Sequence, residues 1–209
     1  MVVVADTSPL IYLSRAGVLD LLNVLFGEVV VPRAVWTEAV DRRPSAPGLD
    51  ALKTASWIRV VDGEVSMADL GLDAGETAAI LLAEGLHADL LLIDERLGRR
   101  VAEARGLAVR GTIGVLVQAR HTGALPALRP VLDAIVADGF RISPTLLREA
   151  LAAVKEMAWR SNAFLHRFRG SSNLTLAGLN WSGSNGPAHS FMDSCSGCFG
   201  SAIARRNSL

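Results

Sequence analysis

The sequence predicts an α/β protein in which a mainly parallel sheet of four to five strands has helices on both faces. Short apolar runs alternate with longer segments of helical periodicity, the order expected for parallel strands joined by right-handed crossovers. Two of these runs end in an aspartate, Asp6 and Asp94, and such sheets bind ligands at the carboxyl ends of their strands. The chain has 209 residues, half of them hydrophobic, which is enough for one domain with a buried core and an appendage.

The first third of the chain is predicted to contain three strands and three helical segments. The strands are expected at 2–5, 28–31 and 58–61, and the helices at about 9–25, 33–41 and 49–56. Ser8 is suited to the N-cap of the first helix, and Pro9 to its first position. The apolar spacing of this segment is interrupted near Gly17, and two prolines and a glycine predict a loop over 42–49.

The following part of the chain is predicted to contain two more strands and five helices. The strands are expected at 90–93 and 108–110, and the helices at 73–86, about 96–105, 113–121, 127–137 and 144–156. Asp73 is expected to cap its helix, with Glu76 at the spacing of a capping box. Beyond these helices, Ser, Gly and Asn dominate and periodicity stops. We therefore predict a domain over 1–156, and a low-complexity tail over 157–209 that is disordered or non-native.

The composition of the chain limits the kinds of binding partner and the cellular compartment that we expect. Lys and Arg together number 21, as do Asp and Glu, so a polyanion would have to bind at a local basic patch. Two cysteines cannot form a disulfide framework, and nothing resembles a signal peptide or an apolar run that spans a bilayer. We expect a cytoplasmic protein without membrane contact. Cys195 and Cys198 have zinc-ligand spacing, but a single pair is weak support for a four-ligand site.

Four acidic residues are the candidate chemical groups. Asp6 and Asp94 each follow an apolar strand, so their carboxylates converge if the two strands are neighbours. Glu38 and Glu76 lie on predicted helices that could overhang the same edge. Clustered carboxylates raise one another's pKa unless a cation neutralises them, and Mg²⁺ or Mn²⁺ prefers oxygen ligands. Such a cation can activate water for attack on a phosphodiester, as in many nucleases.

Each of these acids also has a structural interpretation. Asp6 could cap the helix that follows it, although a functional role is favoured. Asp94 is equally well explained as a helix cap, and the spacing of Glu76 alone favours the capping box. The spacing of Glu38 alone favours an exposed helix face. Glu95 could replace Asp94 in a site or could stabilise the dipole of the next helix.

A basic stripe follows these acids. The arginines are Arg96, Arg99, Arg100, Arg105 and Arg110. Contacts from arginine to phosphate supply most of the sequence-independent affinity for nucleic acids, and Arg96 and Arg99 are the candidates to hold an RNA strand. An ordinary solvated helix face explains the stripe about equally well.

An ordered set of motifs along residues 1–156 resembles a known family. The motifs are DTSPLI from Asp6, VVP from Val30 with Glu38 beyond it, LDAGETAAI from Leu72, LLIDE from Leu91, VRGTIGVL from Val109 and GFRIS from Gly139. This set is similar to the PIN domain, specifically to the small prokaryotic, VapC-related branch catalogued as a domain of unknown function. The resemblance implies a three-layer α/β/α sandwich with an acidic pocket.

The resemblance also implies a chemistry and a set of site residues. PIN domains are expected to cleave RNA, usually single-stranded, with Mg²⁺ or Mn²⁺. By motif, the four catalytic and metal-binding acids correspond to Asp6, Glu38, Glu76 and Asp94. Thr7 or Ser8 matches a hydroxyl that orients the first aspartate or a water, and Glu95 is a further supporting candidate. Many family members are toxins silenced by a small antitoxin protein, and homodimers are common among them.

The sequence thus predicts a metal-dependent endoribonuclease, the toxin of a toxin–antitoxin pair. Asp6 and Asp94 would hold the main metal, with Glu38 and Glu76 completing the site. The alternative is a non-catalytic PIN-like module that binds RNA or a protein. A phosphatase of the haloacid-dehalogenase type is disfavoured, because Ser8 stands where that chemistry needs a second acid.

Overall fold

A five-stranded sheet with strand order β3-β2-β1-β4-β5 forms the centre of the fold, and every neighbouring pair of strands is parallel. The strands are β1 (Val3–Ala5), β2 (Val29–Pro32), β3 (Ile58–Val61), β4 (Leu90–Leu92) and β5 (Val109–Arg110). The computed structural model describes residues 1–42, 47–62 and 70–156, which belong to one unit of the chain. All five predicted strands are present, so the predicted α/β class is confirmed.

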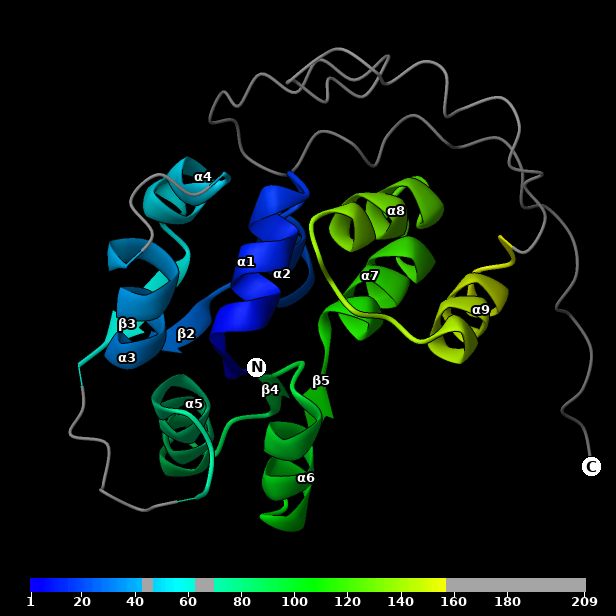
Figure 1. The fold of residues 1–209 in the computed structure, drawn as a ribbon. Coiled ribbons are helices and arrows are strands. Elements are labelled where there is room, and N and C mark those ends of the chain that lie inside the picture. The colour runs from blue at the N-terminus through cyan, green and yellow to red at the C-terminus, as the bar shows by residue number, and fades with distance from the viewer. Residues whose placement is uncertain (43–46, 63–69, 157–209) are drawn as a thin grey trace, which may run out of the picture. The chain divides into compact units, whose positions relative to one another are not determined.

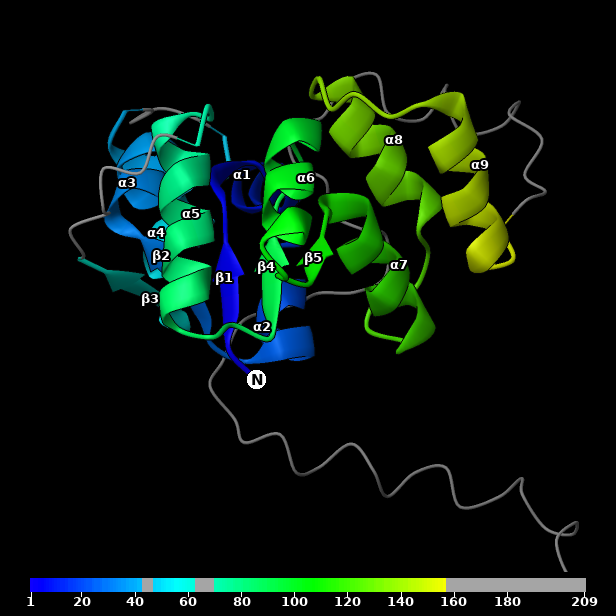
Figure 2. The ribbon, with the colours of Figure 1, turned by 90° about the horizontal axis from the view of Figure 1, so that it is seen from below.

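Helices cover both faces of this sheet. They are α1 (Thr7–Arg15), α2 (Leu21–Phe26), α3 (Arg33–Trp36), the π-helix η1 (Thr37–Asp41), α4 (Leu49–Thr54), α5 (Ala74–Gly85), α6 (Arg96–Ala104), α7 (Thr112–His121), α8 (Arg129–Ala137) and α9 (Pro144–Ala153). Helices α5 and α6 lie on one face, and α1, α2 and α7 lie on the other (Figures 1 and 2). The three-layer arrangement of the PIN-like fold is therefore confirmed.

The strand order creates a switch point between β1 and β4. From β1 the chain moves outward to β2 and then β3, whereas β4 adds to the other side of β1 and is followed by β5. Ala5 is in register with Leu92, and the backbone N–H of Asp6 donates to the carbonyl of Leu92 at 2.9 Å. The residues that follow β1 and β4 therefore lie at the same edge of the sheet, where open α/β sheets bind ligands.

The central strands are apolar because the sheet is covered on both faces. Val3, Val4 and Ala5 of β1 are completely buried, and so is Leu92 of β4. This core holds the backbone at the ends of β1 and β4 in place.

The first helical segments differ from the prediction in two respects, and the predicted break near Gly17 is present. The first helix begins at Thr7 and not at Pro9, so the prediction that Ser8 is its N-cap was wrong. Asp6 occupies the N-cap position in an extended conformation, because β1 runs directly into the helix. Gly17 has a φ of 68° and separates α1 from α2. The helix expected over 33–41 changes to a π-helix at Thr37–Asp41.

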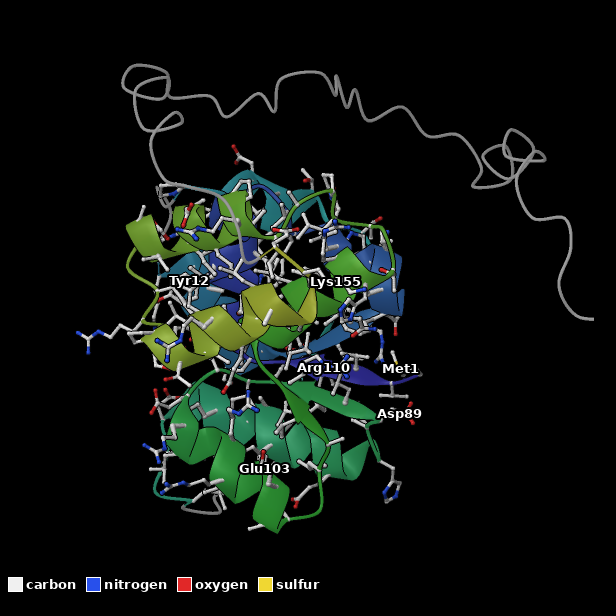
Figure 3. The ribbon with its side chains drawn as sticks, turned by 90° about the vertical axis from the view of Figure 1, so that its right-hand side faces the viewer. Met1, Tyr12, Asp89, Glu103, Arg110 and Lys155 are labelled. Atoms are coloured by element: carbon white, nitrogen blue, oxygen red, sulfur yellow. The ribbon has the colours of Figure 1, made fainter. Side chains whose placement is uncertain are left out.

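The C-terminal helices pack against α1 and α7. The ring of Tyr12, labelled in Figure 3, meets the ring of Phe140 edge to face, with centroids 4.8 Å apart. Glu156 closes this part of the domain, because its carboxylate accepts hydrogen bonds from the backbone N–H groups of Leu128 and Arg129 at the start of α8 and pairs with Arg120 of α7 at 2.8 Å.

Two further predictions concern the C-terminal tail and the absence of a membrane-spanning helix. The predicted tail over 157–209, with Cys195 and Cys198, lies outside the described residues. Among the residues that are described, no helix has both the length and the apolar character needed to cross a membrane.

Candidate functional site

Asp6 lies at the centre of the acidic edge, directly after β1. Its side chain is packed into the domain, and the residue is only 3% exposed. Burial and the negative charges of Glu76, Asp73 and Glu38 together raise the pKa of Asp6 to about 7, although a hydrogen bond from the backbone of Thr7 lowers it. Near neutral pH this carboxyl group is therefore poised between its charged and neutral forms.

Glu38 is brought to this edge by the π-helix η1. The hydroxyl of Thr7 donates to Oε2 of Glu38 at 2.9 Å, which ties η1 to the start of α1. A Cβ at Gly75 would lie 3.1 Å from Oε2 of Glu38 and 3.4 Å from both Oδ1 of Asp73 and Oγ1 of Thr7. The first turn of α5 therefore lies against these three side chains, and a Cβ at residue 75 would require Oε2 of Glu38 to shift slightly.

Glu76 approaches the same group from α5. Asp73 caps this helix by accepting a hydrogen bond from the backbone N–H of Glu76 at 2.7 Å. The residue is 6% exposed, and burial together with the charges of Asp73, Glu95 and Glu38 raises the pKa of Glu76 to about 7. Oε1 of Glu76 would lie 3.2 Å from a Cβ at Gly98 of α6. Glu76 thus occupies the space between α5 and α6.

Asp94 follows β4 at the same edge but has different neighbours. Oδ1 accepts a hydrogen bond from the backbone N–H of Thr112 at 2.8 Å, and Oδ2 accepts one from the Thr112 hydroxyl at 2.6 Å. A Cβ at Gly111 would lie 2.7 Å from Oδ1 of Asp94 and 2.9 Å from Nη1 of Arg99. Burial raises the pKa of Asp94, while the Thr112 hydrogen bonds and the charge of Arg99 oppose that shift. Asp94 is thus directed at α7 and Arg99.

The structure therefore divides the predicted site. It brings Asp6, Glu38 and Glu76 into mutual electrostatic contact, and it directs Asp94 toward α7. The Thr7 hydroxyl donates to Glu38, whereas the resemblance implies that it orients Asp6 or a water, and Ser8 is half-buried on the next position of α1.

The remaining predicted residues lie on or before α6. Glu95 is its exposed N-cap residue, and its charge acts on Glu76. Arg96 is exposed at the first position of α6, and Arg99 lies beside Asp94. The positions of Glu95 and Arg96 leave their side chains accessible to a ligand at this edge.

Two residues of this edge were missed by the sequence analysis. Asp73 was interpreted only as a helix cap, yet its charge acts on both Asp6 and Glu76. Thr112 lies between the strand predicted over 108–110 and the helix predicted over 113–121, and it supplies both hydrogen bonds to Asp94. A threonine two residues after the end of a short parallel strand is a signal for such a role, because it lies near the ligand-binding edge of the sheet.

The oxygen donors of this acidic group are of the type that hard divalent cations bind. Asp6, Glu38 and Glu76 offer only carboxylate oxygens, which Mg²⁺ and Mn²⁺ prefer, and their mutual repulsion is the kind that a cation relieves. Across residues 1–42, 47–62 and 70–156, no group of three or more His, Cys, Asp or Glu side chains is already arranged as metal ligands. A cation would have to draw these oxygens together.

The fold and the acidic group define an α/β protein with a carboxylate-rich site at the switch point of its sheet. A family model described as a PIN domain, DUF3368, matches residues 2–156, and the chain belongs to this family. The recognition of a PIN-like domain from sequence motifs is thereby confirmed, and the fold is of a nuclease type. Comparison with curated proteins and with solved structures finds no match.

Proposed function

We propose that this chain is a divalent-metal-dependent endoribonuclease that hydrolyses phosphodiester bonds of single-stranded RNA with Mg²⁺ or Mn²⁺. The observation that carries the proposal is the group formed by Asp6, Glu38 and Glu76. These acids lie near the switch point of the sheet, where the charges of Glu38 and Glu76 raise the pKa of Asp6 and the charge of Glu38 raises the pKa of Glu76. Such an arrangement costs stability unless a cation binds there, and membership of the PIN family points to nuclease chemistry.

Each residue of the edge has a part in this proposal. When bound, the cation would supply Lewis acidity and neutralise charge that develops on the phosphate. Asp6, Glu38 and Glu76 would hold it, and the Thr7 hydroxyl would keep Glu38 turned toward the site. The exposed guanidinium of Arg96 would bind a flanking phosphate of the RNA.

The test is cleavage of an end-labelled single-stranded RNA with Mn²⁺, beside a duplex RNA and a single-stranded DNA of the same sequence. Asp6→Asn should lower the cleavage rate at least about 10³-fold, because it removes a central carboxylate charge. Asp89→Asn is the matched control, because Asp89 is exposed near Met1 at the opposite edge of the sheet (Figure 3). Undiminished cleavage by the Asp6 variant would refute the assignment.

The biological setting that we propose is a toxin with a small cognate antitoxin, acting as a monomer or a homodimer, and it rests on the PIN resemblance. Expression of the wild-type chain in a bacterial host should arrest growth, and Asp6→Asn should not. A growth-neutral protein that binds RNA equally well with Mn²⁺ or with a chelator would instead indicate the non-catalytic binding module.

A further inference from the structure

The two consecutive acids after β4 face different neighbours. Both carboxylate oxygens of Asp94 accept a hydrogen bond from Thr112, and the charge of Arg99 acts on the same group. Thr112 is completely buried at the first position of α7. If Asp94 turned away toward a cation, the N–H and the hydroxyl of Thr112 would lose a partner inside the protein, which is unfavourable.

Glu95 has none of these constraints and lies on the side of the acidic group. It is the exposed N-cap residue of α6, and Gly98 is three residues further on, so both share one face of the first helical turn. The carboxylate of Glu76 lies against Gly98, since a Cβ there would be 3.2 Å from Oε1. The charge of Glu95 accordingly acts on Glu76.

We propose that Glu95, and not Asp94, is the acid of this segment that binds the divalent cation. Asp94 is then a positioning residue, which fixes the start of α7 and Arg99 against the end of β4. This inference rests on the proposed function and changes which residues make up its metal site.

The experiment compares Glu95→Gln with Asp94→Asn in the full chain. Glu103→Gln is the matched control, because it removes one exposed carboxylate from the same helix (Figure 3). Two readouts are needed, which are Mn²⁺ affinity by calorimetry or by electron paramagnetic resonance, and the melting temperature in the presence of EDTA.

Glu95→Gln should weaken Mn²⁺ binding at least about tenfold and leave the metal-free melting temperature unchanged. Asp94→Asn should lower the metal-free melting temperature by about 5 °C, through its contacts to Thr112, and leave Mn²⁺ affinity within about twofold. Glu103→Gln should change neither quantity. Mn²⁺ affinity that falls in the Asp94 variant and persists in the Glu95 variant would overturn the proposal.

Thr112→Val provides a second variant in case Asp94→Asn does not fold. It removes the hydroxyl and keeps the backbone N–H, so it should lower the melting temperature without changing Mn²⁺ affinity. A loss of Mn²⁺ affinity in Thr112→Val would show that Thr112 orients Asp94 as a ligand, against the proposal. If wild-type protein neither binds Mn²⁺ nor cleaves RNA, the proposed function fails together with this inference. If the wild-type protein binds Mn²⁺ and cleaves RNA but the variants do not show the expected Mn²⁺ affinities, only this inference fails.

Discussion

Glu156 and Asp6 are two carboxylates that the same domain treats in opposite ways. Burial would raise the pKa of Glu156, but hydrogen bonds from Arg120 and from the backbone of Leu128 and Arg129 outweigh burial and hold the pKa below its usual value. Burial, together with the charges of neighbouring acids, raises the pKa of Asp6 to about 7. The fold therefore stabilises the charged form of Glu156 and destabilises the charged form of Asp6.

The comparison separates acids that stabilise the domain from acids that are available to a ligand. Glu156 links the start of α8 to α7, and its negative charge is stabilised by hydrogen bonds from both helices. Asp6 is held by the end of β1 in a place where its charge is costly. Proteins retain such unfavourable charge chiefly at functional sites, where a ligand restores the balance. Asp94 lies between these two cases, because burial raises its pKa while both of its oxygens accept hydrogen bonds from Thr112, and those hydrogen bonds are why we assign it a positioning role.

The largest expected effect is on the pH dependence of stability. A carboxyl group whose pKa is raised in the folded state stabilises the fold below about pH 4, and this contribution is lost as the pH rises to about 7. Asp6→Asn should therefore be more stable than wild type by about 4 kcal/mol at pH 8 in EDTA, and about equal to it at pH 4. Urea unfolding at both pH values measures the difference.

Divalent cations sharpen this prediction. Mn²⁺ should stabilise the wild-type protein at pH 8, where the acids are charged, and should have little effect on Asp6→Asn. A variant that is destabilised equally at pH 4 and pH 8 would contradict the view that Asp6 carries unfavourable charge.

Replacement of Glu156 should have the opposite sign. Glu156→Gln removes the charge that Arg120 and two backbone N–H groups bind, so the free energy of unfolding should fall by about 2 kcal/mol near pH 7. Chemical denaturation gives this value, and Mn²⁺ affinity should not change. Glu149→Gln on the exposed face of α9 is the control and should alter stability by less than about 0.5 kcal/mol. Equal losses of stability in Glu156→Gln and Glu149→Gln would contradict the stabilising role of Glu156.

The smallest effect is expected for Thr7. Thr7→Val keeps the shape of the side chain but removes the hydroxyl that donates to Glu38, so stability should fall by about 1 kcal/mol. Mn²⁺ affinity should fall a few-fold, because Glu38 loses a contact that orients it. Thr7→Ser retains the hydroxyl and should preserve the metal affinity. If valine and serine behave alike in a Mn²⁺ titration, the hydroxyl has no orienting role.

Much of the fold was available from the sequence. Apolar runs such as Val2–Val4 predicted the three buried strands β1, β2 and β4, because strands covered on both faces have no polar side. The position of Asp6 after β1 predicted its place at the ligand-binding edge, since strand direction alone decides which end of a strand meets that edge. The capping role of Asp73 followed from local spacing, and the side chain does accept the N–H of Glu76.

The arrangement of the site was not available in this way. The π-helix that carries Glu38 changes the face on which its side chain lies, and a pattern with a period of 3.6 residues does not predict it. Asp94 and Glu95 are adjacent and chemically equivalent in the sequence. Two tertiary contacts distinguish them. Thr112 donates hydrogen bonds to Asp94, and the first turn of α6, which Glu95 precedes, lies beside Glu76.

The sequence by itself thus determined the order of the elements, the edge of the sheet at which the site lies and the acidic residues that reach it. Periodicity, capping and strand direction are local properties, and they are written in consecutive residues. Tertiary structure alone decided which carboxylates are compensated and which repel one another. That balance depends on contacts between residues far apart in the chain, as the pair of Asp94 and Thr112 shows.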